Sequence, residues 1–257
     1  MRRVVMTLCL ALLAGLSASA YAIDHDNLDE GRPLRLEDAY PIASGEWAVE
    51  MGAGLSAQRK SRTRGFFPFE VLYGLVPNLQ VSIGTTLFTD PRQIEGQTKS
   101  GDMQLSGLYN FNQETLSLPA LGLRVTVNAP TGTASSGVDV RVKGLVTKSF
   151  DRLSVHVNPA YEMFSGTSPL DRDGRFELAL GASYPLRAPK NTLTTVLGDV
   201  FTEQTPRRGD PQIVGIEAGV RQQWTPWTVL DAGLGTELAG PTNRSSVFLT
   251  VGFSIGF

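Results

Sequence analysis

Cysteine is almost absent from this sequence, since Cys9 is the only one among 257 residues. A chain with one thiol cannot close a disulfide within itself or build a cysteine-based metal site. After residue 22 no apolar run is long enough for a transmembrane helix. An excess of positive charge is missing too, because 23 basic residues stand against 25 acidic ones. These absences argue against a disulfide scaffold, a helical membrane protein and a nucleic-acid binder.

The first 22 residues have the pattern of a secretory signal peptide. Arg2 and Arg3 precede an apolar stretch over residues 4–16, and Ala20-Tyr21-Ala22 is a small-x-small cleavage pattern. The apolar stretch is too short for a membrane anchor. Cleavage after Ala22 leaves 21 basic and 25 acidic residues, a net charge of −4. We therefore expect an exported protein.

Residues 23–44 form the expected periplasmic N-terminal segment, lying against or inside the periplasmic mouth of the domain that the rest of the chain forms. The group Asp24, His25, Asp26 and Asp29 could suggest a metal site. An acidic, flexible tail is the simpler interpretation, because chain termini are seldom tied down. We expect no metal site and no cofactor.

From residue 45 to residue 257, apolar and polar residues alternate with a period of two. In the closing stretch Val247, Leu249 and Val251 share one face, and Thr250 and Gly252 lie on the other. Expected strands cover residues 45–58, 65–74, 79–89, 101–110, 120–128, 138–149, 153–164, 175–184, 192–202, 212–224, 227–238 and 247–257. The stretch 192–202 has two registers, of which Asp199 fits only one.

The connections between these stretches alternate in length. Those after the second, sixth and tenth strands are tight turns, whereas residues 90–100, 129–137, 165–174 and 203–211 are longer and polar. This asymmetry is typical of outer-membrane barrels. A soluble β-sandwich or lipocalin-like barrel would also alternate, but it would have fewer strands. We predict an all-β, transmembrane antiparallel β-barrel of about 12 strands, within a range of about 10–14.

Residues 31–50 carry a family resemblance. Arg32-Pro33-Leu34, Glu37-Asp38-Ala39, Gly45 and Glu50 resemble the opening of outer-membrane proteins grouped as the "MetA-pathway of phenol degradation" family, and Asn128-Ala129-Pro130-Thr131-Gly132 is similar to the end of a mid-barrel strand there. The resemblance extends over residues 31–257. It implies an outer-membrane transport barrel, in a family of which some members are associated with catabolism of aromatic compounds.

Charged residues on the faces opposite the apolar ones are the candidate site. The early strands supply an acidic wall and the middle strands a basic wall, which together would create a transverse field across a pore. The alternative is an internal salt-bridge network that fills the lumen, and a barrel of this size fits either. The lumen candidates are Glu46, Glu50, Glu70, Asp102, Arg124, Arg141, Lys143, His156, Arg175, Glu177, Glu217 and Arg221.

The small inner face of the closing strand suggests where a path would run. Thr250, Gly252, Ser254 and Gly256 must pair with the first strand, which carries Glu46 and Glu50. We expect open space beside this acidic wall.

Ser154, His156 and Asn158 share one strand face and have the residue types of a lipid hydrolase. Side chains two residues apart on one strand are a poor nucleophile–base pair, so we expect no enzyme. The leading hypothesis is a channel for passive uptake of small molecules, aromatic or otherwise mixed apolar and polar. The alternatives are a closed structural or surface-interaction barrel and, more remotely, an outer-membrane lipid hydrolase.

The expected partners follow from the outer-membrane location. They are a small-molecule solute, outer-membrane lipids and lipopolysaccharide. The basic cluster Arg59, Lys60, Arg62 and Arg64 could bind lipopolysaccharide phosphates, although an ordinary solvated loop is the simpler interpretation of it. The family resemblance further implies recognition of the terminal strand, ending in Phe257, by the barrel-assembly machinery. Nucleic acid is not an expected partner.

Overall fold

A computed structural model describes residues 23–60, 63–89, 98–133, 135, 137–165, 167–186 and 193–257. The expected signal peptide, residues 1–22, and Arg62 of the basic cluster lie outside the described residues. None of the described segments is a helix with the length and apolar character that a membrane crossing requires.

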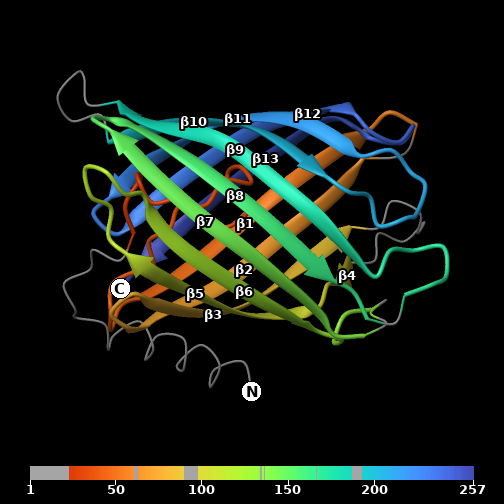
Figure 1. Ribbon diagram of the computed structural model, residues 1–257, viewed down its shortest axis with the longest axis horizontal. Coiled ribbons are helices and arrows are strands. Elements are labelled where there is room, and N and C mark those ends of the chain that lie inside the picture. Colours follow the sequence, from red (N-terminus) through yellow and green to blue (C-terminus); the bar gives the residue numbers. More distant parts are fainter. Residues whose placement is uncertain are drawn as a thin grey trace, which may run out of the picture.

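The described residues form one antiparallel sheet that closes on itself (Figure 1). Its strands are β1 (Trp47–Gln58), β2 (Arg64–Val76), β3 (Leu79–Thr89), β4 (Thr98–Ser100), β5 (Met103–Asn112), β6 (Ala120–Ala129), β7 (Asp139–Phe150), β8 (Leu153–Met163), β9 (Gly174–Leu186), β10 (Thr194–Glu203), β11 (Ile213–Thr225), β12 (Thr228–Ala239) and β13 (Ser245–Gly256). β4 and β5 both pair with β3, at opposite ends, so the thirteen segments fill twelve positions around the barrel.

The barrel closes between its first and last strands. β1 pairs with β13 from Ala48 opposite Gly256 to Gln58 opposite Ser245. At the end of this seam the amide of Trp47 donates to the carbonyl of Phe257, and the amide of Phe257 donates back to the carbonyl of Trp47. The predicted closed barrel of about twelve strands is therefore confirmed.

The two faces of the strands have the predicted chemistry. Large apolar side chains such as Leu55, Leu105 and Leu249 are exposed on the outside. Polar side chains of the same strands, such as Glu50, Asn110 and Ser254, point inward and are buried. The alternation follows from the pleat, because successive side chains in a strand point to opposite faces. A lipid-facing exterior requires this arrangement.

β10 departs from this rule and resolves the ambiguous register. Asp199 points inward, but so do Leu197 and Phe201, which are 6% and 3% exposed. Val196 and Val200 face outward. The strand is apolar on both faces because part of its inner face is covered by other residues of the chain.

That cover is the N-terminal segment, residues 23–44, which lies inside the lumen in the half of the barrel that carries the C-terminus (Figure 1). We call it the plug. Ile23 and Ile42 both pack near the start of β1 and the start of β12, so the plug enters and leaves at the same end. The amide of Leu28 donates to the Asp38 carboxylate at 2.7 Å, which joins the two arms. The expected flexible tail is therefore wrong, because its residues bind the inner wall.

Candidate functional site in the barrel lumen

The plug has no regular secondary structure, so the wall must satisfy its backbone polar groups. Asn158 does this on both sides of Glu37, whose amide donates to Oδ1 at 2.8 Å and whose carbonyl accepts from Nδ2 at 3.0 Å. Asn110 Nδ2 donates to the carbonyl of Ala39 at 2.8 Å. Irregular backbone at membrane depth is tolerated where protein groups replace water in this way.

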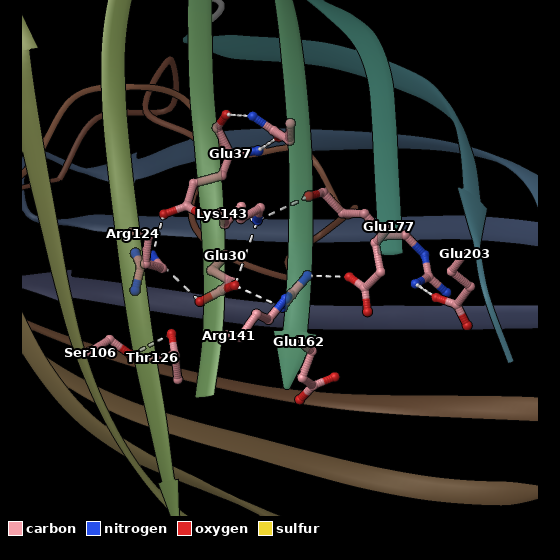
Figure 2. Close-up of polar contacts among 12 residues, drawn as sticks. Glu30, Glu37, Ser106, Arg124, Thr126, Arg141, Lys143, Glu162, Glu177 and Glu203 are labelled. Atoms are coloured by element: carbon pink, nitrogen blue, oxygen red, sulfur yellow. Dashed lines mark hydrogen bonds and ion pairs between the residues drawn. The ribbon is translucent and has the colours of Figure 1, made fainter. Parts of the chain in front are cut away.

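Charged groups of the plug meet the basic wall formed by β6 and β7 (Figure 2). Glu37 lies 2.5 Å from Arg124 Nε and 2.8 Å from Lys143 Nζ. Glu30 lies 3.0 Å from Arg141 Nη1, 3.4 Å from Arg124 Nε and 3.6 Å from Lys143 Nζ. Two carboxylates of the plug are thus shared among three cations of the wall. The geometry matches the predicted salt-bridge network in its chemistry, with the plug as the other partner.

The opposite wall binds plug cations. Arg32 Nη2 lies 2.9 Å from Glu50 Oε2, and its Nη1 lies 3.2 Å from Asp231 Oδ2. Arg35 contacts Glu203 at 2.6 Å and Glu217 at 3.1 Å. All these carboxylates come from β1 and β10–β12. Of the acidic wall expected from the early strands, Glu50 lies here, and the other three carboxylates come from the late strands.

One pair has the reverse polarity. Arg221, which is fully buried on β11, binds Asp29 of the plug at 2.7 Å. The contact gives this arginine a partner inside the barrel, where an unpaired charge would be costly.

A cavity of about 320 Å³ lies on the loop-bearing side of the plug. Its floor is Glu30, Gly31 and Arg32, and its walls include Glu70 and Arg141. Most of its other lining side chains are hydroxyls, amides and carboxylates, with Phe66 as an aromatic member. The lumen is therefore divided into a filled half and a polar vestibule.

The space expected beside the closing strand is filled at Gly252, whereas Glu50 of the acidic wall does line the cavity. A side chain at Gly252 would collide with the guanidinium of Arg32, and one at Gly233 would collide with the carbonyl of Pro33. The Thr250 hydroxyl donates to the same carbonyl at 2.7 Å. The small residues make room for the plug, because only a wall without side chains allows its backbone so close.

Four further candidates lie around this network. Glu70, on the vestibule wall, is 3.6 Å from Arg124 Nη1. Arg175 and Glu177 on β9 contact each other at 3.1 Å, and both extend the basic-wall network. Glu46 is half-buried at the end where the plug leaves the lumen.

Asp102 lies away from the lumen network. Its carboxylate accepts from the Gly132 amide at 2.8 Å and from the Ser135 hydroxyl at 3.0 Å. These contacts hold the loop after β6 against the rim of the barrel. Among the described residues, the Asp102 carboxylate accepts hydrogen bonds from that loop.

The three residue types of a hydrolase do not assemble here. His156 contacts Thr147 at 3.2 Å and Ser183 at 3.1 Å. Ser154 contacts the hydroxyl of Ser149. With Asn158 bound to the plug, the geometry provides no nucleophile–base pair among them.

Arg32, Arg35, Glu30 and Glu37 were not among the predicted lumen residues. Their signal was present, since Leu34 and Leu36 alternate with Arg35 and Glu37 as in an extended segment with two different faces. A second signal was the pair Leu197 and Phe201, because apolar side chains that point into a polar lumen must be covered by other residues of the chain.

Comparison with protein families identifies the barrel. The profile of the family described as "Putative MetA-pathway of phenol degradation" matches residues 40–254. The chain belongs to this family. The match begins where the plug ends its course through the lumen, so residues 23–39 lie outside it. Among proteins with curated descriptions, none matches this sequence.

Solved structures share the fold of this family member at low sequence identity. An outer membrane channel from Pseudomonas putida F1 is 16% identical, with a TM-score of 0.68, over 90% of this chain and 100% of that one. The NanC porin is 11% identical, with a TM-score of 0.59, over 80% and 98% of the two chains. The KdgM porin is 10% identical, with a TM-score of 0.55, over 82% and 99%. At these identities the similarity establishes the architecture of outer-membrane barrels.

Proposed function

We propose that this protein is an outer-membrane channel for passive uptake of small molecules, and that movement of the plug opens it. The observation that carries the proposal is the vestibule, a cavity of about 320 Å³ that ends on Glu30, Gly31 and Arg32. A solute that enters from the loop side meets the plug directly. The family description, and the words channel and porin in the names of the similar structures, support the same function.

The vestibule lining favours polar solutes. Charged, amide and hydroxyl side chains form most of it, and Phe66 and Phe69 add two rings. An aromatic compound of the kind that the family description suggests would therefore need polar or charged substituents. Export through the expected signal peptide and insertion with the terminal Phe257 at the periplasmic side belong to the same proposal.

A closed structural barrel is the second candidate, and the burial of the plug favours it. Leu36, Glu37 and Ala39 are between 0% and 1% exposed, and their polar groups have partners. If the plug never leaves, function would reside in the outer loops. The two candidates differ in one measurable property, which is conductance.

Planar-bilayer recording of the mature chain, with and without residues 23–44, separates them. A channel predicts brief openings for the full-length protein and a large, steady conductance after deletion. Circular dichroism and heat-modifiable gel mobility control for barrel folding. Two folded barrels that both fail to conduct would overturn the channel and leave the closed barrel.

A further inference from the structure

The plug carries opposite charges on either side of Gly31, and each charge is held by a different wall. Glu30 lies against three cations of β6 and β7, with Arg141 at 3.0 Å, Arg124 at 3.4 Å and Lys143 at 3.6 Å. Without Glu30 and Glu37, these three cations would form a site for an anion. Carboxylate is a natural occupant, because arginine and lysine form strong, charge-assisted hydrogen bonds with it.

Arg32 occupies a corresponding site for a cation. Its guanidinium contacts Glu50 at 2.9 Å and Asp231 at 3.2 Å, and donates to the Met51 carbonyl at 2.8 Å. Both carboxylate side chains are almost fully buried, at 3% and 0% exposure. Without Arg32, the buried carboxylates of Glu50 and Asp231 would share the one nearby cation Arg221, so this pole also favours a cationic occupant.

Gly31 separates the two poles and faces open space. A side-chain carbon at this position would meet no atom within 4 Å. Glu30, Gly31, Arg32, Glu50 and Arg141 all line the vestibule. A solute in the vestibule therefore lies beside both poles at once, with only the plug between it and full contact with the wall.

We propose that these wall groups form a two-pole binding site for a small zwitterionic solute, which carries a carboxylate and an ammonium or guanidinium group. Glu30 and Arg32 are an internal stand-in for that solute. The carboxylate takes the place of Glu30 at Arg124, Arg141 and Lys143, and the cationic group takes the place of Arg32. This inference rests on the proposed channel function and names its substrate class.

The site should prefer a solute with two opposite charges because release of the plug exposes charged wall groups of both signs. A ligand shifts an equilibrium only by its differential affinity for the two states. A simple anion compensates the basic pole and leaves the two carboxylates of Glu50 and Asp231 with the single guanidinium of Arg221. A simple cation leaves Arg124 and Arg141 with the wall carboxylates Glu70 and Glu177, and leaves Lys143 without a contacting carboxylate among the described residues. A zwitterion compensates both poles, so it stabilises the released state more than either single ion does.

Accessible charges in the vestibule favour the same class of solute. The side chains of Arg141 and Glu70 are 27% and 22% exposed. They come from β7 and β2, which are separated around the barrel by β3, β5 and β6. A solute with two opposite charges can engage both before the plug moves, which orients it toward the poles below.

The test measures opening of the full-length protein in planar bilayers with matched probes. These are ω-amino acids of graded length, from 3-aminopropanoate to 8-aminooctanoate, each with the carboxylate and the alkylammonium of the same chain length. At one length or more, the zwitterion should raise the open fraction on the order of tenfold above either single ion, since each 1.4 kcal/mol is a factor of ten. Equal effects of all three classes at every length would overturn the site.

Wall variants locate the effect. Arg141→Gln with Glu50→Gln should abolish the advantage of the zwitterion, measured as the ratio of its effect to those of the single ions. Asp173→Asn with Arg208→Gln removes an exposed acid–base pair of the outer loops, and should leave the ratio unchanged. A ratio that survives in the wall variant would overturn the assignment to these residues.

The protein without residues 23–44 distinguishes failure of the inference from failure of the channel. If that protein conducts ions but admits the three probe classes at equal rates, only the two-pole site is wrong. If it folds and conducts nothing, the channel itself is wrong.

Discussion

Two sides of the lumen hold the plug by different chemistry. On the side of β6 and β7, Glu30 and Glu37 bind cations of the wall. On the side of β9 to β11, the plug residues Leu28, Leu34 and Leu36 pack against Ala179, Leu197, Phe201 and Ile213. The first contact is ionic and borders the vestibule, whereas the second is a small hydrophobic core inside a barrel.

The difference shows which part of the wall is compatible with an open lumen and which part requires the plug. A charged wall is compatible with water or with ion pairs, so it fits an open and a closed lumen equally. An apolar patch facing water costs about 25 cal/mol for each Å² exposed, so it fits only a covered lumen. We therefore expect the apolar side to set how firmly the plug is closed, and the proposed two-pole site makes the ionic side the one at which a solute competes with it.

The largest expected effect comes from placing a charge on the apolar side. Leu36→Asp puts a carboxylate among Leu28, Leu197 and Phe201, where the nearby guanidinium of Arg35, 4.0 Å from the Phe201 ring centroid, is already bound by Glu203 and Glu217. Loss of a buried leucine alone costs about 2–5 kcal/mol, and the unpaired charge adds to it. We expect a constantly open channel and rapid trypsin cleavage after Arg35, followed by mass spectrometry.

The matched control for that experiment is Leu36→Met, which conserves volume and should keep the plug docked. A Leu36→Asp protein that stays closed and resists trypsin would show that the apolar contact does not determine closure. The ionic side would then have to carry both roles.

A smaller loss of plug stability is expected from a substitution on the ionic side. Arg124→Gln leaves Glu37, at 1% exposure, with Lys143 as its remaining cation. Removing one partner of a buried ion pair costs about 3–5 kcal/mol, and the second cation keeps the loss near the lower end. Hydrogen exchange of the Ala39 amide, which donates to Thr147 Oγ1, should accelerate on the order of a hundredfold.

The double variant Arg124→Gln with Glu37→Gln sharpens this result. It removes the uncompensated charge, so it should exchange more slowly than Arg124→Gln alone. Faster exchange in the double variant would mean that the ion pair contributes more than the avoided penalty, and the ionic side would then be a clamp in its own right.

The comparison of the two sides also explains what the sequence could and could not predict. The outer faces were predictable because every strand must present apolar side chains to lipid. Residues such as Leu105 and Leu249 therefore recur with a period of two. β10 was ambiguous because its inner face also carries apolar residues, which pack against the plug. One strand pattern cannot separate lipid from a protein core, since both require apolar residues such as Leu197 and Val200.

The wall charges were predictable as inward-facing groups, but their partners were not. Arg124 and Lys143 are on the predicted inner faces. Their partner Glu37, however, lies 87 residues before Arg124 in the sequence. Pairing across such a separation depends on the path of an irregular segment, which has no period to follow. The small residue Gly252 suggested space, and only the structure shows that Arg32 fills it.

The third prediction concerns pH and the joint between the two arms of the plug. Burial raises the pKa of Asp38 to about 7, although the amides of Leu28 and Tyr40 donate to its carboxylate and favour the charged form. In a released plug the carboxyl returns to about 3.9. The docked plug therefore gains stability as pH falls from about 7 toward 4, and loses it as pH rises through that window.

Open fraction should accordingly increase on the order of tenfold between pH 5 and pH 8, and Asp38→Asn should remove the dependence. Glu30 does not interfere. Burial alone would raise the pKa of Glu30, but Lys143, Arg124 and Arg141 outweigh burial and lower it to about 2. A pH profile unchanged by Asp38→Asn would assign the effect to other groups.

The fourth prediction isolates the basic wall from the plug. In the protein without residues 23–44, Arg141→Glu with Lys143→Glu replaces two positive charges of the lumen by negative ones. The cation-to-anion permeability ratio, obtained from reversal potentials in a salt gradient, should shift toward cations by a few-fold, because charged rings and walls set ionic selectivity. An unchanged ratio would show that ions pass along the apolar side instead.

The smallest effect is expected where the chain touches the mouth of the barrel. Glu114, in the turn after β5, binds Lys148 at 2.8 Å, and the Tyr40 hydroxyl donates to it at 3.5 Å. The two side chains are partly exposed, at 21% and 17%, and pairs near the surface contribute about 0–1 kcal/mol. Glu114→Gln should therefore change the open fraction less than about fivefold, measured beside Arg124→Gln in the same bilayers. A larger change would mean that the anchoring of Tyr40 at the mouth, and neither side of the lumen, limits the exit of the plug.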